Sequence, residues 1–152
     1  ELAHKWMAQK YGCWAEYRGN RNGLLLALLM GAVGFLIAAP GAVMVAGHVT
    51  NRQHGHIAAV GPLTNIVLAL AALPFYLLLA NALGPLGWLG ALARFLVIIN
   101  IILGGFNMIP VPPLDGSKIM AWSNVAYGAI VAGILALAMA YWYIAPFSTI
   151  NI

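Results

Sequence analysis

The sequence predicts an all-α fold, a polytopic bundle of transmembrane helices that forms a single membrane-embedded domain over residues 1–152. Hydrophobic residues make up 63% of the chain and charged residues 7%, whereas about one quarter of the residues of a soluble domain are charged. Four apolar stretches approach the length of about 20 residues that a helix needs to cross a bilayer. These stretches cover residues 24–46, 62–80, 92–109 and 125–143.

The N-terminal part of the chain predicts a helix followed by a small β element. Residues 1–10 contain neither proline nor glycine, their apolar positions fall near helical spacing, and Gly12 follows as a stop signal. Residues 13–23 alternate loosely in polarity and end in a Gly-Asn-Arg-Asn-Gly turn cluster. That pattern is typical of a short strand and a turn. We expect this element to lie at the membrane surface.

The middle of the chain predicts a re-entrant segment and then a polar loop. Residues 24–46 are apolar, but they contain glycines and an Ala-Pro-Gly break at 39–41 that a straight spanning helix would not need. We therefore expect this segment to dip into the membrane and return. Residues 47–61 are polar and predict a surface loop that ends in a short strand at 56–60. Pro62 then marks the first turn of the next helix, where its missing N–H costs nothing.

Two further helices are predicted after a turn around residues 84–87. The first covers residues 92–109 and ends at the prolines 110, 112 and 113, which cannot continue a helix. The last begins near Trp122 and ends before Pro146.

The charges and the cysteine content exclude several classes of partner. The net charge is +4, but the basic residues are scattered singly and form no stripe, so no nucleic-acid partner is expected. A membrane-topology signal explains them better. Cys13 is the only cysteine, so the chain has no internal disulfide.

Acidic residues are rare enough in this chain to indicate function. There are only three, and Glu1 and Asp115 lie within or beside apolar helices, where an unpaired carboxylate is costly. The sequence Glu1-Leu2-Ala3-His4 is what remains of a His-Glu-x-x-His motif once its first histidine is removed. In that motif two histidines bind zinc from one helix face, and the glutamate activates the metal-bound water.

Three motifs together resemble the site-2 protease family of intramembrane zinc metalloproteases. Residues 1–5 match the end of the first family motif, and Gly61-Pro62-Leu63-Thr64-Asn65 matches the motif of the middle helix. Residues 107–116, Asn-Met-Ile-Pro-Val-Pro-Pro-Leu-Asp-Gly, match the Asn-x-x-Pro-x-Pro-x-Leu-Asp-Gly motif. The resemblance extends over nearly the whole chain, and it implies that the sequence begins inside the zinc-binding motif.

The resemblance also implies a role for each candidate residue. His4 and Asp115 would bind one catalytic Zn²⁺ with a histidine directly before Glu1 as the third ligand, and the fourth position would remain open for water. Glu1 would act as general base, while Asn65 and Asn107 would contact the substrate backbone or the developing oxyanion. The implied function is an endopeptidase that hydrolyses peptide bonds in or next to transmembrane helices of protein substrates.

Other interpretations remain open at this point. The chain could be a catalytically inactive relative that only binds membrane helices, or a metal-transporting membrane protein. A transporter predicts polar residues spread along several spans, but here they concentrate at the ends of two helices. Asn65 and Asn107 could equally cap or cross-link helices. His48, His54 and His56 could form a second metal site, although an exposed polar loop explains them more simply.

The positive-inside rule predicts the topology of this multi-pass protein. If His4 and Asp115 meet at one metal, residues 24–46 must begin and end on the same side as His4. Only Arg94 then lies outside, as an interfacial anchor, so the active site is expected near the cytoplasmic face. The basic residues on the cytoplasmic side are Lys5, Lys10, Arg18, Arg21, Arg52 and Lys118.

Overall fold

A computed structural model describes residues 1–19, 41–46, 49–80 and 87–148 of the chain. Three of its helices, over Asn51–Leu79, Gly87–Asn107 and Asn124–Tyr143, are long and apolar enough to cross a membrane by length and composition. The predicted all-α fold is therefore confirmed. The elements, in chain order, are α1 (Leu2–Lys10), β1 (Trp14–Gly19), β2 (Gly41–Ala46), α3 (Asn51–Ala80), α4 (Gly87–Asn107), α5 (Asp115–Trp122) and α6 (Asn124–Ser148).

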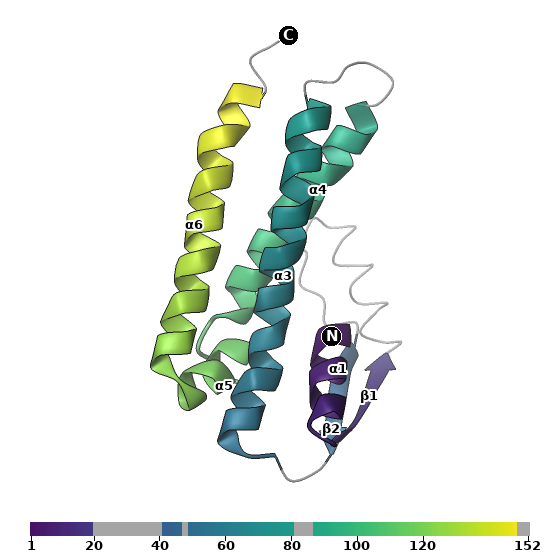
Figure 1. Cartoon of the computed structure of the whole chain (residues 1–152), viewed down its shortest axis with the longest axis vertical. Helices are drawn as coiled ribbons and strands as arrows, with labels where there is room; N and C mark the ends of the chain where they lie inside the picture. The colour runs from purple at the N-terminus through teal and green to yellow at the C-terminus, as the bar shows by residue number, and fades with distance from the viewer. Residues whose placement is uncertain (20–40, 47–48, 81–86, 149–152) are drawn as a thin grey trace.

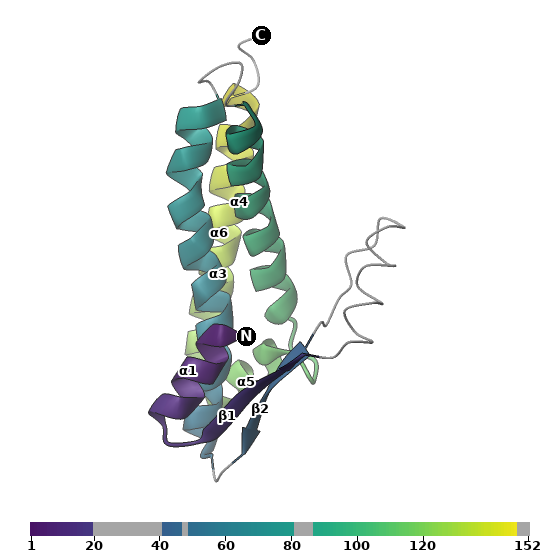
Figure 2. The same ribbon diagram turned by 90° about the vertical axis from the view of Figure 1, so that its right-hand side faces the viewer.

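The three long helices form one bundle, and all the short elements gather at one of its ends. Helices α3, α4 and α6 run along the long axis of the molecule, while α1, β1, β2 and α5 surround the end where α3 begins (Figures 1 and 2). Within an apolar 18-residue stretch of each candidate span only 22%, 28% and 17% of the residues are buried. The outer faces are thus apolar and exposed, which suits hydrocarbon far better than water.

The predicted β element is present as a two-stranded antiparallel sheet. β1 pairs with β2 in a register that places Trp14 opposite Ala46 and Gly19 opposite Gly41. Residues 41–46 were expected to belong to the re-entrant segment, and this part of the prediction is wrong because they are extended and paired. The rest of that segment, and the turn cluster after Gly19, lie outside the described residues.

The predicted loop at 47–61 and the strand at 56–60 are also wrong, because α3 already begins at Asn51. A reciprocal cap starts this helix: the backbone N–H of Gln53 donates to the hydroxyl of Thr50, and the backbone N–H of Thr50 donates to the side chain of Gln53. This is a capping box, which satisfies two backbone donors at once. Pro62 consequently lies inside α3 and not at its start.

The C-terminal part of the chain contains one helix more than predicted. Asp115 begins the short helix α5, and α6 follows from Asn124 through Pro146 to Ser148, beyond the expected end. The core between α3, α5 and α6 contains Ala58, Met108, Ile119, Ile130 and Ile134. Ile119 is fully buried there, so α5 is packed against the bundle and holds Asp115 in a defined position.

Candidate metal centre

His4 and Asp115 come together from opposite parts of the chain. Nε2 of His4, on α1, lies 3.2 Å from Oδ2 of Asp115, at the first position of α5. The two side chains are 15% and 13% exposed, so both are largely removed from solvent. The sequence motifs are 111 residues apart (115 − 4), and packing of both short helices on α3 brings them into contact.

The imidazole of His4 is oriented by one turn of α3. Its Nδ1 donates a hydrogen bond to the carbonyl oxygen of Ile57, at 2.7 Å, which leaves Nε2 as the nitrogen that faces Asp115. A second contact comes from Gly61, one turn further along α3. A Cβ added to Gly61 would lie 2.5 Å from Nε2 of His4 and 3.2 Å from Oδ2 of Asp115. The histidine ring therefore occupies the space that a side chain at position 61 would need.

Asp115 is held from its own helix and from the preceding loop. Its Oδ1 accepts a hydrogen bond from Nζ of Lys118 at 3.2 Å, so Oδ2 is the oxygen turned to His4. The carboxylate also lies at the N-terminus of α5, where the helix dipole favours negative charge. Gly116 lies against the backbone of Met108 and Ile109 so closely that a Cβ there would overlap the Met108 carbonyl. This contact fixes the start of α5 relative to the end of α4.

The segment between α4 and α5 accepts hydrogen bonds from one side chain of α6 and one side chain of α5. The hydroxyl of Tyr127, on α6, donates to the carbonyl of Met108 at 2.9 Å, and the hydroxyl of Ser117 donates to the carbonyl of Leu114 at 2.7 Å. The Pro112–Pro113 peptide bond is cis. The two hydrogen bonds make the proline-rich motif an ordered connection that leads to Asp115.

The charges of the pair support each other in the metal-free protein. Burial lowers the pKa of His4, but the hydrogen bond to Asp115 and its charge outweigh this, so the pKa is raised above 6.5. For Asp115, burial raises the pKa, but His4 and then Lys118 outweigh it, and the pKa falls below 3.8. The imidazolium and the carboxylate therefore stabilise one another when no metal is bound.

The geometry of the pair fits two ligands of a tetrahedral zinc ion. Ligands bound at about 2.0–2.1 Å with tetrahedral angles lie about 3.3 Å apart, close to the observed 3.2 Å. A hydrogen bond from Nδ1 to a backbone carbonyl is the usual way to orient a metal-binding histidine. Among residues 1–19, 41–46, 49–80 and 87–148, no group of three His, Cys, Asp or Glu side chains meets. Within those residues the centre therefore supplies two ligands.

Glu1 lies at the N-terminal end of the helix that carries His4. Its carbonyl accepts the first helical hydrogen bond, from the N–H of Lys5 at 3.0 Å, and its side chain is exposed. The spacing of three residues places Glu1 and His4 on the same face of α1.

The asparagines occupy different positions around the end of α4. Asn65 lies one turn beyond Gly61 on α3 and faces α4, since a Cβ on Gly104 would be 3.5 Å from the Cβ of Asn65. Asn107 is the last residue of α4 and is half-buried. Asn100 was not singled out in the sequence, yet it is buried within α4 and donates to the carbonyl of Leu96 at 2.8 Å. That bond satisfies the amide inside its own helix and indicates a structural role.

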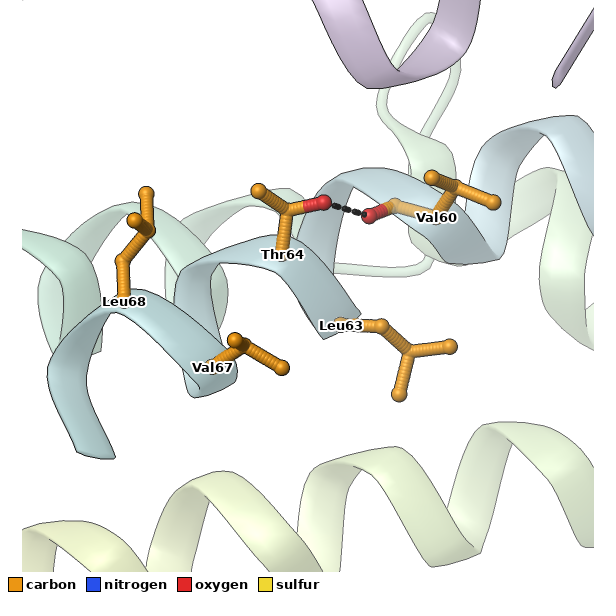
Figure 3. A pocket seen from close by; sticks show the side chains of 5 residues that line it. All are labelled: Val60, Leu63, Thr64, Val67 and Leu68. Atoms are coloured by element: carbon orange, nitrogen blue, oxygen red, sulfur yellow. Dashed lines mark hydrogen bonds between the residues drawn. The ribbon is translucent and has the colours of Figure 1, made fainter. Parts of the chain in front are cut away.

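An apolar groove runs along α3. It has a volume of about 240 Å³ and is lined by Val60, Leu63, Thr64, Val67 and Leu68. Figure 3 shows that the Thr64 hydroxyl points back along the helix, where it donates to the Val60 carbonyl at 2.7 Å. The only polar side chain of the groove is thus satisfied within α3. The groove begins at the residue before Gly61 and continues from there along the candidate span.

Several residues that build the centre were not identified from the sequence. Ile57 and Gly61 orient His4, but an apolar residue and a glycine carry no chemical signal of this role. Lys118 was assigned to topology only.

A second cluster lies between α1, α3 and α5 and consists of Tyr11, His56 and Trp122. The alternative metal site was expected in a loop, but two of its members, His54 and His56, lie on α3. His48, the third member of the alternative metal site, lies outside the described residues.

Comparisons with known proteins agree with a zinc centre. A protein of Methanocaldococcus jannaschii named "Putative zinc metalloprotease MJ0611" is 39% identical over 147 residues, which covers 93% of this chain and 74% of that protein. A second protein of the same organism, named "Zinc metalloprotease MJ0392", is 28% identical over 121 residues. That match covers 79% of this chain and 29% of the relative.

The two other comparisons gave no match. No family model matches the sequence. No solved structure matches it either. The similarity to MJ0611 extends over most of both chains. The chain therefore belongs to the family of MJ0611, a protein named as a "putative zinc metalloprotease".

Proposed function

We propose that this protein is a zinc endopeptidase of the site-2 type, which hydrolyses peptide bonds in or next to transmembrane helices of its protein substrates. The observation that carries the proposal is the 3.2 Å approach of His4 Nε2 to Asp115 Oδ2 at the end of a bundle of long apolar helices. The names of the relatives support a metalloprotease. The apolar helices support a substrate that lies in the membrane.

Each residue of the centre has a separate task in this mechanism. His4 and Asp115 would hold one Zn²⁺ together with a histidine directly before Glu1, and the bound ion would supply Lewis-acid polarisation of the scissile carbonyl and of a water molecule. Glu1 would act as the general base, accepting a proton from the attacking water and giving it to the leaving amine. Asn65 and Asn107 position the substrate backbone from α3 and α4.

The apolar groove on α3 supports an intramembrane substrate. Its occupant in the proposal is an apolar segment of the substrate, because the lining side chains are apolar except for Thr64 and the groove lies on a candidate span. A peptide bond inside a helix is shielded by its own hydrogen bonds and must be extended before it can be cut. The strand β1 offers a surface at the same end of the bundle where such an extended segment could be received by strand addition.

The distribution of basic residues supports a cytoplasmic location of the centre. Lys5, Lys10, Arg52 and Lys118 belong to elements at the end of the bundle that carries the centre, whereas Arg94 lies in the other half of α4 and donates to the Tyr141 hydroxyl. Loops rich in Lys and Arg favour the cytoplasmic side. In this orientation α3 runs outward from the cytoplasm and α4 returns to it.

Zinc content and cleavage of a membrane-helix substrate test the proposed function. The protein is prepared in detergent with a histidine directly before Glu1, and zinc is measured in the same samples. Wild type should bind one zinc and cleave the substrate, Glu1→Gln should bind zinc but not cleave, and His4→Ala and Asp115→Ala should lose the metal. A wild type without zinc would refute the mechanism, and so would an active Glu1→Gln variant. If wild type binds zinc but does not cleave the substrate, the protein is a catalytically inactive relative.

A further inference from the structure

The two short helices that carry the metal ligands are each attached to α3 at a second point, seven residues after the ligand. Tyr11 directly follows α1 as its C-cap, seven residues after His4, and Trp122 is the last residue of α5, seven residues after Asp115. Seven residues make about two helical turns, so each second point lies on the same side of its helix as the ligand. Both second points meet at the same residue of α3, His56.

His56 contacts both helices through its ring. The Tyr11 hydroxyl is hydrogen-bonded to Nδ1 of His56 at 2.5 Å. The imidazole also stands edge-on to the indole of Trp122, with ring centroids 4.5 Å apart and planes at 90°. Trp122 is fixed further by Gly55, where a Cβ would overlap its side chain. The next residue, Ile57, provides the carbonyl that holds His4.

We propose that His56 is a positioning residue for the metal centre. Apolar packing of Ile119 and of Ala8 holds α5 and α1 against the bundle, and a second polar or ring contact on the side of the ligand restricts rotation of each helix about its own axis. His56 provides the second contact for α1 and for α5 at once, and so fixes the two ligand-bearing helices relative to each other. The inference rests on the proposed zinc site of His4 and Asp115. It adds a residue that touches neither the metal nor the substrate.

The partners of His56 allow its hydrogen bond and its ring contact to be separated. His56→Phe keeps a ring beside Trp122 but removes the hydrogen bond to Tyr11. Tyr11→Phe removes the same hydrogen bond by deleting one oxygen atom, so it is the variant that disturbs folding least. His54→Phe is the matched control, because it is the same substitution two residues earlier on α3, at an exposed position.

Cobalt(II) binding to the detergent-solubilised protein, with a histidine directly before Glu1, tests the proposal. The affinity for Co²⁺, its visible absorption spectrum and the thermal midpoint are measured for each variant. We expect His56→Phe and Tyr11→Phe each to bind Co²⁺ about 10 to 100 times more weakly, as is typical when the support of a metal ligand is lost. Both should also change the spectrum, and His54→Phe should match wild type. The double variant with Tyr11→Phe and His56→Phe should bind Co²⁺ no more weakly than His56→Phe alone, because both substitutions remove the same hydrogen bond.

Several outcomes would overturn the proposal. If both variants have the Co²⁺ affinity and spectrum of wild type while their thermal midpoints fall, His56 has a structural role only. An equal loss of affinity in His54→Phe would show a general effect of the substitution on α3. If wild type itself binds no Co²⁺, the proposed zinc site fails and this inference fails with it. If wild type binds Co²⁺ and the variants bind it with the same affinity and spectrum, the role of His56 is overturned and the proposed zinc site is not.

Discussion

Replacing Gly61 by alanine should damage the metal centre without destabilising the helix that carries it. The new Cβ would lie 2.5 Å from His4 Nε2, whereas ordinary contacts begin at 3.4 Å, so the nitrogen must move by about 0.9 Å (3.4 − 2.5). Zinc ligands tolerate displacements of about 0.2 Å. The displacement exceeds that tolerance several-fold, so we expect zinc affinity to fall at least about 10- to 100-fold, the range found when ligand support is lost. Helix propensity alone would favour alanine by up to about 1 kcal/mol.

Competition for zinc with a chelator measures this effect in the detergent-solubilised protein with a histidine before Glu1. Gly128→Ala is the matched control: Gly128 lies in α6, and a Cβ there would have no atom within 4 Å. It should gain similar helix propensity and keep the zinc affinity of wild type. Zinc binding by Gly61→Ala at wild-type affinity would refute the close packing of His4 on α3.

Three further predictions concern topology, pH and substrate. Cysteines at Asn51 and Gly87, in a Cys13→Ser background, should differ in intact cells: an impermeant thiol reagent should label position 87 and not 51, and the reverse would overturn the orientation. In the metal-free protein, the contribution of His4 to stability is fully present below its unfolded pKa of 6.5, and it is lost as the pH rises through the raised pKa of the folded state. The contribution of Asp115 is fully present above its unfolded pKa of 3.8, and it is lost as the pH falls through the lowered pKa of the folded state. The difference in thermal midpoint between wild type and His4→Asn should therefore be largest between pH 3.8 and 6.5, and a maximum at alkaline pH would contradict the ion pair. Replacing every Gly, Pro and Asn of a cleaved substrate helix by Leu or Ala should slow its cleavage, and an unchanged rate would argue against unwinding.

The sequence predicted the long apolar helices and the approach of His4 to Asp115 because both depend on local patterns. Apolar length identifies a span by itself, and the motifs around His4 and Asp115 are short runs of unusual residues. The start of α3 was missed because its first residues are polar, and polarity was taken to indicate a loop. The Thr50 to Gln53 capping box was the available signal. Helix α5 was missed because an Asp-Gly pair is also common turn chemistry.

The supports of the centre could not be predicted from the sequence for a different reason. Ile57 acts through its backbone carbonyl, Gly61 through the side chain that it lacks, and His56 through partners in two other helices. None of these roles depends on neighbouring residues in the sequence. They follow from packing α1 and α5 on the same two turns of α3, which only the three-dimensional structure shows.

The continuous course of α3 would set the depth of the proposed zinc site in a membrane. Gly61 lies 19 residues before the end of this helix at Ala80 (80 − 61), a rise of about 28 Å. The hydrocarbon of a bilayer is about 30 Å thick. If Ala80 lies at one edge of the hydrocarbon and α3 runs along the bilayer normal, the imidazole of His4 would lie near the opposite edge, where headgroups and water begin. Hydrolytic water would then need no channel through the bilayer, and a substrate helix would have to expose its scissile bond at the lipid boundary rather than at the midplane.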